Sequence, residues 1–221
     1  MATTKKVKKS IKEDQLVTYA VRASGWAQEH FNQVIVGVVV LVAVIAVLVF
    51  TANSRQNAAR QGERDLSVAL RQFTAGDLEG ARTGFERVDE RFGGKNSLIA
   101  RFYQAETELR QRNYTGALAT YDSYLDSADD FPAFRESAVY GKALCYEGLE
   151  DHAGAAQAFV TLMSLTHEDD PRYLDSAFQA GEFFARAGNQ EEAVKYYQVV
   201  SDNAVGSLKH RAAVAVSLMS Q

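Results

Sequence analysis

The residues of this chain that could carry out chemistry are few and lie far apart. Its histidines are His30, His152, His167 and His210, and no two of them lie within four residues of each other. Zinc sites need closely spaced His, Cys or Glu ligands, and that spacing does not occur in this sequence. The single cysteine, Cys145, has no partner for an internal disulfide, and its apolar neighbours favour a buried thiol over a reactive one.

Two short segments resemble ligand-binding loops but lack their defining residues. Gly93-Gly94-Lys95-Asn96 lacks the preceding glycine and the Ser or Thr of a phosphate loop, so we expect a turn that ends a helix. Glu168-Asp169-Asp170 could contact Ca²⁺ but lacks alternating ligand spacing, which favours a solvated loop. The Gly-x-Ser-x-Gly elbow of hydrolases does not occur either. The sequence therefore predicts a protein that is not an enzyme and holds no cofactor or metal.

Charge is divided unevenly along the 221 residues. Residues 1–33 carry six basic and three acidic side chains, whereas residues 53–221 carry eighteen basic and twenty-five acidic ones. Nucleic-acid binding needs clustered Lys and Arg, so an acidic body argues against a nucleic-acid partner. We interpret the basic N-terminus as a membrane-topology signal.

An uncharged, strongly apolar run over residues 34–50 predicts a transmembrane helix. With Thr51 and Ala52 the run has about 19 residues, which span roughly 28 Å at the rise of an α-helix, close to the thickness of the hydrocarbon core. A cleaved signal peptide fits less well, because 33 residues precede the run and its end is a poor cleavage site. The sequence thus predicts an uncleaved anchor over residues 34–52.

The basic residues on either side of the anchor predict its orientation. Six lie before it, and Arg55, Arg60 and Arg64 follow it closely. By the positive-inside rule the N-terminus is cytoplasmic and the body lies outside, which in a bacterium places it in the periplasm, on the inner membrane.

The N-terminal residues 1–33 are predicted to form a basic cytoplasmic tail with an amphipathic helix over residues 11–31. Ser10 and Glu13 have the spacing of a capping box, and apolar side chains follow at helical intervals. Trp26 and Phe31 suit the membrane interface. The alternative is a weakly ordered segment beside the membrane.

A small residue, three others and an aromatic recur four times in the acidic body. The spacings between copies are 36, 38 and 38 residues, and a turn and a helix start precede each copy. No stretch shows the strict alternation of a half-buried strand, so we expect an all-helical body. The four copies are Ala81-x3-Phe85, Ala117-x3-Tyr121, Ala155-x3-Phe159 and Ala193-x3-Tyr197.

These recurrences resemble the tetratricopeptide repeat over residues 62 to about 205. The fourth copy matches most clearly, with Gly181, Phe184, Gly188, Ala193 and Tyr197 on the repeat's small and aromatic positions, whereas the second copy has Glu108 where an aromatic is usual. The resemblance implies an α-solenoid of about four helical hairpins within residues 65–221, ending in a closing helix. Residues 53–64 either continue the membrane helix or link it to the first hairpin.

In tetratricopeptide folds the first helix of each hairpin lines a concave face, and transferring those positions predicts a protein-binding groove. An aromatic then recurs at the same place in three hairpins, with Glu and Arg beside it. The alternative is that these aromatics pack in the core and that the Glu and Arg form ordinary pairs on a solvated helix. The predicted groove residues are Phe102, Glu106, Arg110, Tyr140, Leu144, Phe178, Glu182 and Arg186.

The whole layout resembles a bacterial inner-membrane family whose members are ancillary subunits of the Sec translocon with periplasmic tetratricopeptide-like domains. The resemblance implies a protein-interaction module that assists export or periplasmic chaperoning, with membrane-complex subunits, periplasmic proteins and the lipid bilayer as partners. The alternative is a structural or assembly subunit of another integral-membrane complex, such as a photosynthetic, respiratory or envelope assembly. A shared fold alone does not decide between them.

Overall fold

The computed structural model describes residues 30–127 and 132–219. All the regular secondary structure within these residues is helical. Packing divides the chain into two compact units, Met1–Asn57 and Ala58–Gln221, which are described separately. The predicted tail, the juxtamembrane helix and Trp26 lie outside the described residues, except for residues 30–33. The helices are α2 (Phe31–Ala75), α3 (Leu78–Arg91), α4 (Lys95–Arg110), α5 (Tyr114–Ser127), η2 (Pro132–Phe134), α6 (Arg135–Gly148), α7 (His152–Leu165), α8 (Pro171–Arg186), α9 (Gln190–Asn203) and α10 (Gly206–Met219).

The described part of the first unit is the apolar beginning of α2. An 18-residue window of this helix has a mean hydropathy of 3.3, and none of that window is buried within the structure. Phe31 at its start is 62% exposed. By length and composition, α2 can cross a membrane. Residues 53–64, for which the sequence allowed a helical extension or a linker, are helical.

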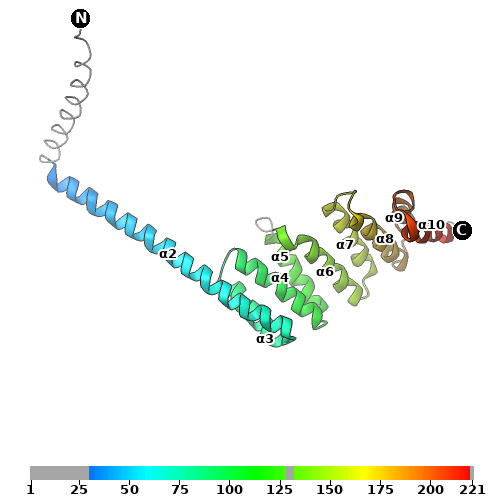
Figure 1. Cartoon of the computed structure of the whole chain (residues 1–221), viewed down its shortest axis with the longest axis horizontal. Coiled ribbons are helices and arrows are strands. Elements are labelled where there is room, and N and C mark those ends of the chain that lie inside the picture. The colour runs from blue at the N-terminus through cyan, green and yellow to red at the C-terminus, as the bar shows by residue number, and fades with distance from the viewer. Residues whose placement is uncertain (1–29, 128–131, 220–221) are drawn as a thin grey trace, which may run out of the picture. The chain divides into compact units, whose positions relative to one another are not determined.

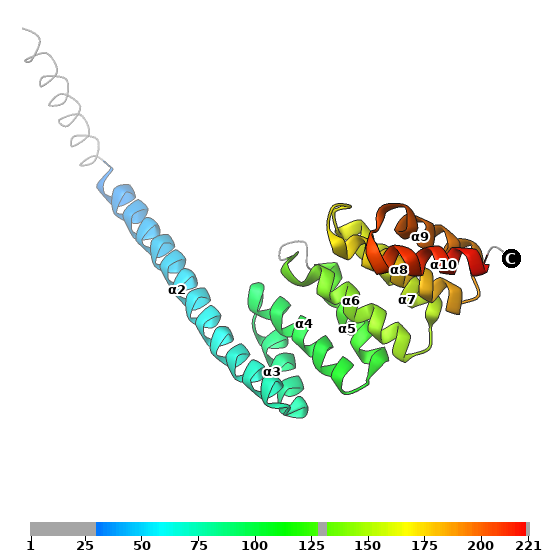
Figure 2. The same ribbon diagram turned by 45° about the vertical axis from the view of Figure 1, so that its right-hand side comes forward.

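The second unit is a stack of helical hairpins, as the sequence predicted. The end of α2 pairs with α3, and the pairs α4–α5, α6–α7 and α8–α9 follow in chain order, with α10 against α9 (Figures 1 and 2). Each helix packs mainly on its neighbours in the sequence, which is the arrangement of a solenoid. This confirms the predicted all-helical solenoid of hairpins.

The turn inside each hairpin has the same backbone geometry. One residue in each turn adopts a positive φ: 82° at Gly76, 61° at Arg112, 60° at Glu150 and 78° at Gly188. This left-handed conformation ends a helix and is easiest for glycine, because glycine has no Cβ. The residue after it starts the second helix, its side-chain oxygen accepting a hydrogen bond from the backbone N–H three residues later. These N-terminal caps are Asp77, Asn113, Asp151 and Asn189.

Small residues lie where the two helices of a hairpin approach most closely. The repeated alanines Ala81, Ala117, Ala155 and Ala193 are fully buried. The space at Gly181 is equally small, since a Cβ added there would lie 2.9 Å from the ring of Tyr197. The aromatic of each copy fills the space between helices. The recurring small residue in the sequence is therefore required by the short distance between the two helix backbones of a hairpin.

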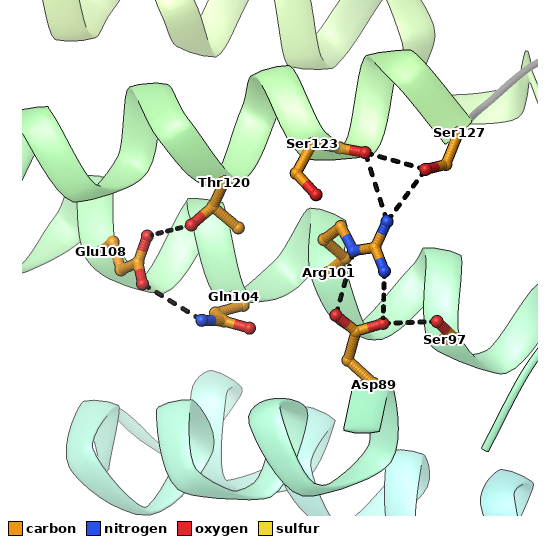
Figure 3. Close-up of polar contacts among 8 residues, drawn as sticks. All are labelled: Asp89, Ser97, Arg101, Gln104, Glu108, Thr120, Ser123 and Ser127. Carbon is orange, nitrogen blue, oxygen red and sulfur yellow. Dashed lines mark hydrogen bonds and ion pairs between the residues drawn. The ribbon is translucent and has the colours of Figure 1, made fainter. Parts of the chain in front are cut away.

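A polar cluster joins the first two hairpins (Figure 3). Arg101 on α4 donates two hydrogen bonds of 3.0 Å to the Asp89 carboxylate on α3, which also accepts one from Ser97. The same guanidinium donates to the Ser123 carbonyl (3.2 Å) and the Ser127 hydroxyl (3.0 Å) on α5. The Arg101 side chain thus links α4 to both α3 and α5.

Glu108, the departure from the repeat pattern, is buried in α4 and has polar partners. The Thr120 hydroxyl donates a hydrogen bond of 2.7 Å and the Gln104 amide one of 3.2 Å to its carboxylate (Figure 3). A buried carboxylate is tolerated only when it is hydrogen-bonded, and these two contacts meet that need.

Candidate protein-binding groove

The first helices of the hairpins line one open groove with a volume of about 990 Å³. Its walls come from α2, α4, α6, α7, α8 and α10, so it extends along the whole stack. Aromatic residues form the largest group in its lining. The charged residues of the lining, called its rim below, are three acidic and three basic ones, Glu106, Glu136, Asp175, Arg110, Arg172 and Arg211. The seven aromatic residues are Phe73, Phe102, Tyr103, Phe134, Tyr140, Phe159 and Phe178.

The three predicted aromatics all line the groove, but they differ in exposure. Phe102 and Phe178 are each only 5% exposed, whereas Tyr140 is 49% exposed. Phe102 stacks on Phe134 with ring centroids 4.5 Å apart, and Phe178 lies 5.4 Å from the Tyr197 ring. The two phenylalanines therefore combine core packing with one face toward the groove. Tyr140 is the ring that a partner could cover.

The predicted charged residues of α4 line the groove but are not paired with each other. Glu106 accepts a hydrogen bond of 2.6 Å from the Tyr121 hydroxyl. Burial and this bond to a carboxylate raise the pKa of Tyr121 well above its usual value. The Arg110 guanidinium lies 3.8 Å above the Phe73 ring, a cation–π contact. The alternative interpretation, an ion pair between Glu106 and Arg110 on α4, is therefore wrong.

The remaining predicted residues, Leu144, Glu182 and Arg186, lie outside the lining of this groove. Leu144 is half-buried in α6. Arg186 is 3.6 Å from Glu147 on α6, and Glu182 is 3.9 Å from Arg211 on α10. Glu182 and Arg186 thus pair with residues of neighbouring helices.

Several residues of the groove were not predicted from the sequence. Phe134 lies in η2, the link between the second and third hairpins, and Phe159 lies on α7. Arg211 comes from α10 and stacks 4.2 Å above the Phe178 ring. Phe73 belongs to α2, whose copy of the repeat is the least regular. Aromatic residues can be recognised in the sequence, but whether their rings reach the groove depends on how successive hairpins pack.

An ion pair bridges the third and fourth hairpins at the rim. Arg172 at the start of α8 contacts Glu136 on α6 at 2.5 Å and Asp170 at 2.6 Å. Asp170 also accepts a hydrogen bond from the Arg172 backbone, and these contacts hold the pKa of that carboxyl below its usual range. Pro171 begins α8, where its missing N–H costs nothing.

The single cysteine of the chain lies in the core of the repeat domain. Cys145 is fully buried, and burial, followed by the charges of Glu106 and Glu108, raises its pKa to about 12. A thiol with such a pKa is a poor nucleophile. Within residues 30–127 and 132–219, no cluster of three His, Cys, Asp or Glu could hold a metal ion.

Comparison with protein-family models supports the repeat assignment. Residues 67–132 and residues 175–205 each match a model described as tetratricopeptide repeat. These matches fall on the first, second and fourth hairpins. The third hairpin lies between the two matches and has the same left-handed turn residue, at Glu150, and the same buried alanine, at Ala155.

Solved structures of tetratricopeptide repeat proteins share this fold. A crystal structure of MamA is 16% identical, with a TM-score of 0.53, over 72% of this chain and 80% of that one. MamA from Desulfovibrio magneticus RS-1 is 21% identical, with a TM-score of 0.50, over 68% and 76%. A tetratricopeptide repeat protein from Parabacteroides merdae is 15% identical, with a TM-score of 0.58, over 73% and 60%. No curated protein matches the sequence. At these identities the likeness concerns the fold alone.

Proposed function

We propose that this chain is a membrane-anchored protein-interaction module of the bacterial cell envelope, which assists protein export or periplasmic chaperoning. Tetratricopeptide repeats indicate a protein-interaction module. The observation that carries the binding site is the group of aromatic residues that line the groove, in which Tyr140 is half exposed. An exposed aromatic ring in an open groove suits the apolar side chains of another protein.

The first part of α2 supports the membrane anchor in this proposal. Its apolar side chains over residues 35–50 are exposed, and water would penalise that surface at roughly 25 cal/mol per Å². A bilayer removes the penalty, and an α-helix satisfies its own backbone there. In the proposed topology the N-terminus is cytoplasmic and the repeats are periplasmic. The span contacts subunits of a membrane complex, while the groove contacts periplasmic proteins.

Site-specific photo-cross-linking in living cells tests the binding site. A photoreactive amino acid at position 140, inside the groove, is expected to capture polypeptides. The same amino acid at position 149 is the control, because Leu149 is similarly exposed, at 44%, but lies outside the groove lining. Changing clients and export components indicate the proposed role. One fixed set of partners at constant stoichiometry indicates a structural subunit instead. If position 140 gives no cross-linked product that position 149 lacks, both roles are contradicted.

A further inference from the structure

The closing helix α10 exposes apolar side chains at the C-terminal end of the stack (Figures 1 and 2). Its inner face carries the fully buried Ala212 and packs in one core cluster with α9. On its outer face Val214 and Leu218 are 43% and 69% exposed, and they lie one helical turn apart on the same side. The terminal repeat of a solenoid normally has a polar outer face, which keeps the protein soluble. The outer face of α10 is therefore a surface that another protein could cover.

The first hairpin, at the other end of the stack, has an open hollow of about 430 Å³ between α2 and α3. All of its lining residues belong to these two helices and none to α4, against which α3 packs with Phe85 and Val88. Gly80 and Gly84 line this α2–α3 hollow from α3, and their lack of side chains leaves the space open. Val68 lines it from α2 and is 46% exposed. The N-terminal end of the stack thus has a recess that can receive apolar side chains.

The two ends also differ in charge. Residues 203–219 contain two basic residues and a histidine but no Asp or Glu, whereas the lining of the α2–α3 hollow has two acidic residues and one basic residue. The Arg211 guanidinium lies 3.9 Å from the Glu182 carboxylate. By contrast, Lys209 on α10 and Asp65 in the hollow form no ion pair with the other residues that the structure describes. One end therefore offers a cation and the other an anion.

We infer that the repeat domains of two copies of this chain associate head to tail, with the outer face of α10 of one copy in the α2–α3 hollow of the next. Leu218 and Val214 cover Val68, and Lys209 pairs with Asp65. The occupant is a second copy because the chain itself carries both of the complementary surfaces. A contact between two different surfaces repeats from copy to copy, so it builds a ring or an open chain.

The size of the contact sets its strength. The 14 residues of α10 form a helix about 21 Å long and about 10 Å wide, so it covers much less than the roughly 800 Å² per partner of a standard stable interface. We therefore expect a weak, reversible association. Copies anchored in one membrane, as proposed above, would have a high local concentration, which favours such a contact.

Disulfide cross-linking of the full chain in intact cells tests the contact. Two differently tagged copies are expressed together, one with Val68→Cys and the other with Leu218→Cys, and the products are separated on a non-reducing gel after oxidation. We expect a dimer that carries both tags, at a yield several-fold above that of Val68→Cys paired with Leu149→Cys. Leu149 is the matched control because it is 44% exposed but lies outside both surfaces. Cys145 is fully buried and stays out of the reaction.

Other occupants of α10 give different products. If α10 pairs with α10 of another copy, Leu218→Cys alone forms a dimer at least as abundant as the mixed one, which would overturn the head-to-tail contact. If α10 lies on a membrane surface or on another protein, the mixed dimer does not exceed the Leu149→Cys control, and the inference is equally wrong. Circular dichroism of the purified variants checks that each is folded.

A charge exchange tests the pairing of Lys209 with Asp65. Asp65→Lys in the Val68→Cys copy is expected to lower the yield several-fold, and Lys209→Glu in the Leu218→Cys copy restores it. Glu90→Lys is the control, since Glu90 is exposed on α3 and does not line the hollow. Failure of Lys209→Glu to restore the yield would refute the proposed pair.

The end-to-end contact and the groove can be tested separately, because the α2–α3 hollow and the groove share no lining residue. Absence of the mixed dimer leaves the groove and the proposed function untouched. Absence of cross-links from position 140 contradicts the proposed function but leaves the contact between copies standing.

Discussion

At the scale of single residues, the four hairpin turns differ in the residue that adopts a positive φ. Gly76 and Gly188 adopt positive φ without steric cost, but Arg112 and Glu150 adopt it with a Cβ. For a residue other than glycine, the left-handed conformation costs about 1–2 kcal/mol. The second and third turns therefore hold stored strain that the first and fourth lack.

Replacing Glu150 by glycine is expected to stabilise the repeat domain. The relief of the left-handed strain is offset in part by the greater entropy of glycine in the unfolded chain, which leaves a net gain of about 0.5–1 kcal/mol. The measurement is urea unfolding followed by circular dichroism. Gly188→Ala, at the equivalent turn, is the matched comparison and should lower the stability. A loss of stability in Glu150→Gly would show that its side chain makes a contact worth more than the strain.

The Cys145 thiol should resist modification in the folded protein. Its pKa of about 12 leaves almost no thiolate at pH 8, and its side chain is fully buried. We expect an aromatic disulfide reagent to leave it intact at pH 8 until urea unfolds the chain, as measured by absorbance. A Gln157→Cys variant supplies the reactive control, since Gln157 is exposed on α7. Rapid reaction of Cys145 in the native protein would contradict its burial.

At the scale of helices, the contacts between neighbouring hairpins hold the groove in shape. Arg101 is the clearest example, because it bonds α3 and α5 from α4 (Figure 3). Its side chain is 22% exposed and that of Asp89 is 20% exposed, so solvent screens this pair only in part.

Arg101→Ala is expected to destabilise the repeat domain by about 2 kcal/mol, because charged hydrogen bonds are lost and Asp89 keeps only a hydroxyl partner. Arg82→Ala is the control. Arg82 pairs with Glu79 and Glu86 inside α3 alone, at an exposed site, and such pairs contribute about 0.3–0.5 kcal/mol. Urea unfolding of both variants makes the comparison. Equal effects would mean that Arg101 does not couple the hairpins.

At the scale of the whole molecule, the apolar beginning of α2 is expected to anchor the chain in a membrane. Arginine at the centre of a spanning helix costs about 2.5–3.5 kcal/mol, so Val42→Arg combined with Ile45→Arg should release the chain from alkali-washed membranes into the supernatant. Val205→Arg is the control, because Val205 is 87% exposed but lies in the repeat domain. Immunoblotting of the two fractions measures the outcome. Retention of the double variant would argue against an anchor here.

Much of the repeat domain could be predicted because its signals are local. A small residue is needed wherever two helices of one hairpin touch, and a turn is needed between them. Ala155 and the turn at Glu150 therefore mark the third hairpin in the sequence alone. The apolar run over residues 34–50 is equally local, since its length and lack of charge are visible without any structure. Whether this run lies in a bilayer stays a prediction.

The groove could be predicted only in part, because its surface depends on contacts between distant segments. Tyr140 lies on the lining, whereas Glu182 and Arg186 lie outside it and form ion pairs with residues of α10 and α6. Phe134 reaches the groove from a link between hairpins, where no periodicity indicates which way a ring points.

The sequence by itself determined the hairpins, their turns and the apolar run, since each depends on spacing within a few tens of residues. Only the tertiary structure decided which side chains share the groove and which charges remain without partners. Arg110 lies over Phe73 on another helix, and Arg172 is paired whereas Asp175 forms no ion pair with the other residues that the structure describes. Such pairings depend on the angle between successive hairpins, and that angle results from the packing of all of them together.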